Sequence, residues 1–126
     1  MKKIIFLLPL IFVLNSCVSS KKIAEVSVTT EKIAKNNFVS DYKIIYNKNY
    51  NFAAIYKSLT KDINGNLPVK VMLYDTKNNK IIWGRKAINA KLEWISKNKL
   101  QVKYLTRDKK HKTLVYDTKT GKVSYI

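Results

Sequence analysis

The chain has 126 residues and carries 25 lysines and arginines against eight acidic residues, which gives a formal net charge of +17. With one cysteine and one histidine, it cannot hold an internal disulfide or a zinc site built from three or four cysteine or histidine ligands. Eight acidic residues leave few candidates for the paired carboxylates of a glycosidase. We therefore expect that the protein is not an enzyme and that it binds no metal and no cofactor.

The first residues are ordered like an export signal. Lys2 and Lys3 precede an apolar run from Ile4 to Leu14, which is followed by Cys17. The run is shorter than the roughly 20 apolar residues that a membrane-spanning helix needs. We therefore expect residues 1–16 to be a signal peptide that is removed.

The segment Leu14, Asn15, Ser16, Cys17 resembles the lipobox of bacterial lipoproteins, in which a large aliphatic residue stands three positions before a cysteine and a small residue directly before it. The resemblance covers the first 17 residues. It implies cleavage before Cys17 and a thioether-linked diacylglycerol on its sulfur, with fatty acyl chains such as palmitate as the membrane anchor. It also implies a place in the cell envelope, on the outer membrane where the cell has one, facing the periplasm or the surface.

The remaining 17–126 have the length of one domain and keep a net charge near +15. Lysine, asparagine and isoleucine all have A/T-rich codons, so a biased genome would raise the lysine count without any anionic partner. Arg85 and Arg107, the two arginines, are too few for a surface that grips phosphates or base edges. The sequence leaves open whether the charge serves binding or reflects codon usage.

The start of the mature chain is small, polar and basic, and we predict a flexible lipidated tether over residues 17–29. A single β domain is expected over residues 30–126. Within it, residues 30–37 fit a helical turn and a strand equally well.

From Asp41 onward, tyrosines and β-branched residues alternate with polar ones in short runs separated by Asn, Asp, Gly and Lys. We predict eight strands, paired as hairpins, in an all-β antiparallel meander that closes as a small barrel or packs as a sandwich. The inward residues expected for the eight runs are Tyr42, Ile44 and Tyr46; Tyr50, Phe52, Ala54 and Tyr56; Val69, Val71 and Leu73; Ile81 and Trp83; Leu92 and Trp94; Leu100, Val102 and Tyr104; Leu114 and Tyr116; Val123 and Tyr125.

One turn sequence occurs twice, as YDTKNNKI from Tyr74 and as YDTKTGKV from Tyr116, 42 residues apart. The spacing is similar to that of the four-stranded blades of β-propellers. The mature chain is too short for the four or more blades of a closed propeller. The alternative is a type I hairpin turn in which Asp75 and Asp117 accept bonds from turn amides.

The segment from Arg107 to Lys112 forms a basic loop, and Lys109, Lys110 and Lys112 are the candidate contacts to an anionic surface. His111, between two lysines, is expected to be a solvated loop residue. Basic residues also alternate with aromatic ones, a pattern that suits single-stranded nucleic acid. That set is Lys43, Tyr46, Lys48, Tyr50, Trp83, Arg85, Lys103 and Tyr104.

The same alternation follows from any half-buried sheet. Because export takes the chain away from cytosolic nucleic acid, we expect no nucleic acid as a partner. We therefore predict a lipid-anchored envelope protein with a non-catalytic binding or scaffolding β domain whose partner is another envelope protein. The alternative is a basic module that contacts anionic envelope polymers or lipid phosphates.

Overall fold

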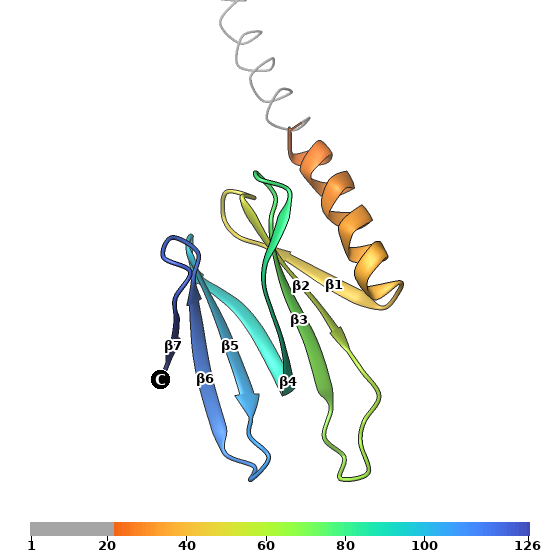
Figure 1. Cartoon of the computed structure of the whole chain (residues 1–126), viewed down its shortest axis with the longest axis vertical. Coiled ribbons are helices and arrows are strands. Elements are labelled where there is room, and N and C mark those ends of the chain that lie inside the picture. The colour runs from red at the N-terminus through yellow and green to blue at the C-terminus, as the bar shows by residue number, and fades with distance from the viewer. Residues whose placement is uncertain (1–21) are drawn as a thin grey trace, which may run out of the picture.

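The computed structural model describes residues 22–126, and in them seven antiparallel strands form one sheet in the order β1-β2-β3-β4-β5-β6-β7, preceded by a helix (Figure 1). The predicted antiparallel β meander is thus confirmed. Closure as a barrel or sandwich is not: the sheet is open, with β1 and β7 at its edges. The signal peptide, Cys17 and the first part of the tether lie outside the described residues.

Residues 22–38 are helical, so the predicted flexible tether is wrong for residues 22–29, and the ambiguous residues 30–37 are helix. The buried stripe of this helix contains Thr30, Ala34 and Phe38, spaced four apart as one helix face requires. The hydroxyl of Thr30 donates to the Val26 carbonyl at 2.7 Å, which satisfies it inside the protein. A polar residue on the buried face hides the helical pattern in the sequence.

The helix covers one face of the first three strands, β1 (Tyr42–Tyr46), β2 (Phe52–Ser58) and β3 (Pro68–Asp75). Its residues Ala34 and Phe38 pack in one cluster with Ile55, Met72 and Tyr74. The ammonium of Lys57 donates to the Phe38 carbonyl at 2.9 Å, where a cation complements the helix C-terminus. β1 and β2 form the predicted hairpin, with Ile44 opposite Ile55.

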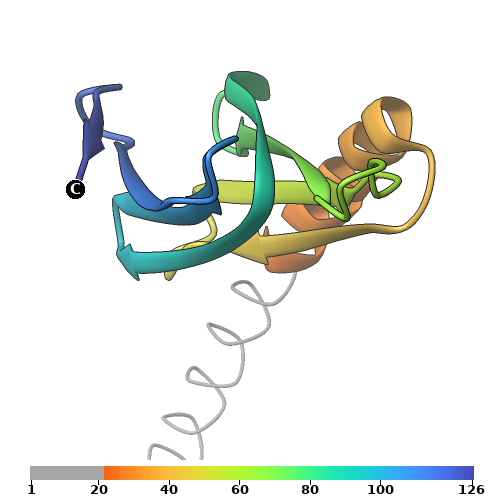
Figure 2. The same cartoon turned by 90° about the horizontal axis from the view of Figure 1, so that it is seen from below.

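β4 (Lys80–Ser96) is one strand of 17 residues, where we predicted two strands separated by a turn, and this reduces the count from eight to seven. Its first part pairs with β3 and its second part with β5. The register shifts between Ile88 and Lys91, and Asn89 between them has a φ of 51°. A bulge therefore bends the chain where we expected it to reverse (Figure 2).

The last strands are β5 (Lys99–Leu105), β6 (His111–Asp117) and β7 (Val123–Tyr125). The predicted third hairpin is confirmed, with Leu92 opposite Val102 and Trp94 opposite Leu100. The bend in β4 brings this half of the sheet over the first half, since the Trp94 indole Nε1–H donates to the Ile45 carbonyl of β1 at 2.9 Å. We call the face enclosed by this bend the inner face; its buried residues are Ala54, Leu73, Ala87, Leu100, Val102, Tyr104, Leu114 and Tyr116.

The repeated Asp-Thr sequence makes two hairpin turns. Asp75 Oδ1 accepts the amides of Lys77 at 3.1 Å and Asn78 at 3.0 Å, and Asp117 Oδ1 accepts that of Lys119 at 2.8 Å. The hairpin alternative accounts for these aspartates. The resemblance to propeller blades stays a prediction.

Candidate functional site

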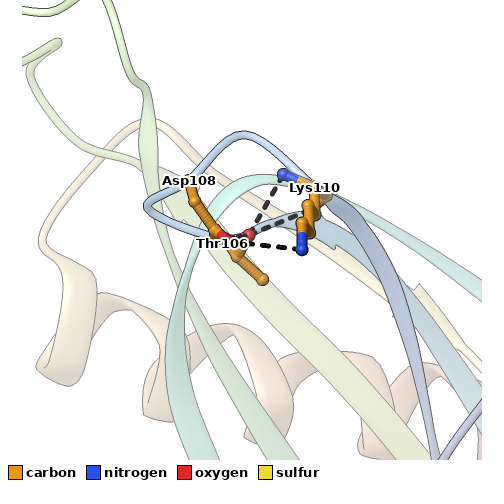
Figure 3. A network of polar contacts seen from close by, with 3 residues as sticks. All are labelled: Thr106, Asp108 and Lys110. Atoms are coloured by element: carbon orange, nitrogen blue, oxygen red, sulfur yellow. Dashed lines mark hydrogen bonds and ion pairs between the residues drawn. The ribbon is translucent and has the colours of Figure 1, made fainter.

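The three lysines proposed as anionic contacts are divided between a turn and the strand that follows it. Lys109 and Lys110 lie in the turn between β5 and β6, where Lys109 has a φ of 62°. The Lys110 ammonium lies 3.8 Å from Asp108 Oδ2 (Figure 3). Both side chains of this pair are largely exposed, so the ion pair adds little stability.

Thr106 organises that turn (Figure 3). Its hydroxyl donates to Asp108 Oδ1 at 2.6 Å and accepts the Lys110 amide at 3.1 Å. The Thr106 hydrogen bond, followed by the backbone of Asp108 itself, holds the pKa of the Asp108 carboxyl below its ordinary value. Lys110 is therefore partly engaged by a carboxylate inside the turn.

Lys112 lies beyond the turn, in strand β6, where it is paired with Tyr104 of β5. There it lines a cavity of about 470 Å³ at the end of the inner face, together with Arg85, Lys86 and Arg107. We call this the basic pocket. The rest of its lining is Pro68, Ala87, Ile88, Tyr104, Leu105, Thr106 and Tyr125. No carboxylate is among the lining residues, and Lys112 acts electrostatically on the carboxylate of Asp108 in the neighbouring turn.

Arg85 is the half-buried member of the basic pocket. Its guanidinium carbon lies 4.8 Å from the centre of the Tyr104 ring and 5.9 Å from that of Tyr125, and Nη1 donates to the Tyr125 hydroxyl at 3.1 Å. Ring faces attract a cation without neutralising its charge. The remaining N–H groups of Arg85 are thus held in place and available to an anion.

Two arginines are too few, by the sequence prediction, for a surface that grips phosphates, but both of them line one pocket in the structure. Ile88 pairs with Leu105, so Arg85 and Arg107 lie just beyond the same end of the β4–β5 ladder. The prediction of two separate strands in place of β4 did not include the pairing of Ile88 with Leu105, which brings the two arginines close together. A continuous β4 paired with β5 would have predicted the site.

A second cavity of about 460 Å³ adjoins the basic pocket and shares Tyr104, Leu105 and Lys112 with it. Lys91, Lys103 and His111 also line it. His111 is exposed, as predicted, but it is the first residue of strand β6 and not a loop residue. In residues 22–126 no group of three His, Cys, Asp or Glu side chains could hold a metal ion.

The aromatic residues considered for nucleic acid do not share one surface. Tyr46, the last residue of β1, and Tyr50 pack with tilted rings whose centres are 5.0 Å apart. Trp83 instead packs on the buried Tyr116 on the inner face, at 5.3 Å. Tyr104 is also buried. These side chains cannot act as a single stacking platform.

No helix within residues 22–126 is both long enough and apolar enough to cross a membrane. Comparison of the chain with models of protein families, with curated proteins and with solved structures gave no significant match.

Proposed function

We propose that this chain is a lipid-anchored cell-envelope protein whose β domain binds an anionic group in the basic pocket. The observation that carries the proposal is the convergence of Arg85, Arg107, Lys86 and Lys112 on one cavity whose lining contains no carboxylate. Arginine matches phosphate and carboxylate oxygens with paired N–H donors, whereas a scattered lysine acts as a point charge.

The arrangement of these basic residues favours an anionic partner over a protein partner. A surface charge that reflects codon usage alone would be scattered, and lysine would carry it. The pocket instead gathers both arginines of the chain and fixes one of them over Tyr104. The ligand class is therefore a phosphate or carboxylate group, as found on envelope polymers and lipid headgroups. The acyl anchor on Cys17 belongs to the proposal through the lipobox resemblance.

The test uses the full-length protein in detergent, titrated calorimetrically with inorganic pyrophosphate. The double substitution Arg85→Lys with Arg107→Lys keeps the charge but removes the paired donors. A hydrogen bond to a charged group contributes about 1.5–3 kcal/mol, so each replacement should weaken binding by about tenfold or more.

The matched control is Lys32→Arg with Lys43→Arg, which also exchanges two basic side chains without changing the charge, but outside the pocket. It should bind pyrophosphate with the affinity of the parent. If the arginine-to-lysine pair bound pyrophosphate like the parent, or if the control lost as much affinity, the pocket would not be the binding site.

A further inference from the structure

Four turns of the sheet lie together at one end of the molecule (Figure 1). Thr76 of the β3–β4 turn donates from its amide to the Asn51 carbonyl at 3.0 Å and from its hydroxyl to the Tyr50 carbonyl at 2.6 Å. Thr118 of the β6–β7 turn donates in the same way, at 2.8 and 3.1 Å, to the Asn98 carbonyl. The two threonines of the repeated sequence thus each join their own turn to a neighbouring one.

A buried asparagine completes this connection. Asn47, at the start of the β1–β2 turn, donates from Nδ2 to the Lys97 carbonyl of the β4–β5 turn at 2.8 Å. The hydrogen bonds therefore link all four turns in one row. We call this the turn cluster; it consists of residues 47–51, 76–79, 97–98 and 118–121.

Each turn of the cluster exposes a lysine: these are Lys48, Lys77, Lys97 and Lys119. The two aspartates beside the cluster, Asp75 and Asp117, accept turn amides. Among residues 22–126 the only ion pair within 4 Å joins Lys110 and Asp108, at the other end of the strands. The turn cluster thus presents four ammonium groups that are not paired with carboxylates.

The described start of the helix lies beside this cluster. A groove of about 730 Å³ is lined by Lys22, Ile23, Glu25 and Val26 of the helix and by residues of the β1–β2 and β3–β4 turns. Cys17 precedes Lys22 by five residues, and five residues span at most about 18 Å. Acyl chains on Cys17 would therefore hold the turn cluster near the lipid surface.

The basic pocket lies at the opposite end. β5 runs from the turn at residues 97–98 to Leu105, which lines the pocket, and the 59–67 and 106–110 loops are at the same far end (Figure 1). Seven residues of strand at about 3.3 Å each separate the two ends by roughly 20 Å.

We propose that the turn cluster is the membrane-facing surface of the anchored protein, that its lysines contact the phosphates of anionic lipid headgroups, and that the basic pocket therefore faces away from the membrane. The inference rests on the acylation of Cys17, which is part of the proposed function. Each lysine close to an anionic membrane should favour the attached orientation about fivefold. Four lysines in one row favour that orientation together, because the anchor holds them near the lipid while the four cations of the basic pocket lie roughly 20 Å away.

The experiment places the full-length acylated protein in nanodiscs that contain phosphatidylglycerol and a gadolinium-chelating lipid, and measures the paramagnetic relaxation of each backbone amide. Amides of the turn cluster should relax several-fold faster than those of the 59–67 and 106–110 loops. The quadruple variant Lys48→Gln, Lys77→Gln, Lys97→Gln and Lys119→Gln should reduce this contrast measurably, as should transfer of the parent to phosphatidylcholine, and the contrast that remains is the part contributed by the anchor.

The matched control removes the same charge elsewhere, as Lys61→Gln, Lys91→Gln, Lys103→Gln and Lys109→Gln, and should keep the contrast. Equal relaxation at both ends of the parent, or faster relaxation of the 106–110 loop, would overturn the proposed orientation. Flotation with vesicles distinguishes failure of the anchor: a parent that does not float, or floats equally well as Cys17→Ser, would refute the acylation itself.

Discussion

Two phenols contact the side chain of Arg85 and restrict it. A single arginine on a strand usually extends into solvent, where its side chain samples many rotamers and loses entropy on binding. Tyr104 and Tyr125 restrict this one, and Tyr104 is itself buried in the inner face. The two rings thus restrict this cation in the free protein, which would lower the entropic cost of the proposed binding.

Tyr74 leads to a prediction about alkaline pH. Burial, and then the neighbouring Asp75, raise the pKa of its phenol above the ordinary value of 10.0. The unfolded chain then ionises first, so the stabilisation is complete below pH 10 and is lost as pH rises through the folded-state pKa. Tyr74→Phe also loses the 2.9 Å bond to Asn79 Oδ1, which should cost about 1 kcal/mol at neutral pH.

Between pH 9 and pH 11.5 the melting temperature of Tyr74→Phe should fall less steeply than that of the parent. Burial and the neighbouring Asp117 raise the pKa of Tyr116 in the same direction, so the double variant with Tyr116→Phe should be flatter still. Parallel melting curves for parent and variants across this range would show that these phenols do not carry the alkaline transition.

At the scale of the elements, the hairpins could be predicted because alternation fixes which face each residue takes. Leu100, Val102 and Tyr104 are buried as expected, and Trp94 packs against the same cluster. The bend in β4 could not be predicted, since a single bulge at Asn89 resembles a short turn in sequence. The helix could not be predicted because Thr30, which is polar, and Ala34, which is small, occupy its buried face in place of large apolar residues.

Val102 tests the inner face of β5 directly, since its side chain is 1% exposed. Val102→Lys would bury an ammonium without a partner, at a cost of several kcal/mol that approaches the whole stability of a small domain. Circular dichroism should show the variant unfolded at room temperature. Gln101→Lys, on the other face of the same strand, should melt within a few degrees of the parent; comparable melting of the two variants would refute the inward face.

At the scale of the whole molecule, the structure separates two kinds of positive charge that the sequence presents as one excess. The turn cluster carries single lysines in a row, which suits a diffuse layer of headgroups. The basic pocket carries both arginines, and two tyrosine rings restrict one of them, which suits one defined anion. No local pattern could separate them, because each set is assembled from turns and strands far apart in the chain.

This separation predicts that the membrane leaves the pocket accessible. Lipid charges are screened over about 8 Å at physiological ionic strength, and roughly 20 Å of strand separates the pocket from the turn cluster. Pyrophosphate should therefore bind the anchored parent with the same affinity, within about twofold, in nanodiscs of phosphatidylglycerol and of phosphatidylcholine. If the pocket faced the membrane, lipid phosphates would compete and affinity in phosphatidylglycerol would fall sharply. The quadruple Lys→Gln variant of the turn cluster supplies the contrast. It keeps its acyl anchor but not the lysines that favour its orientation, so its pocket can reach the headgroups and its affinity should fall in phosphatidylglycerol alone.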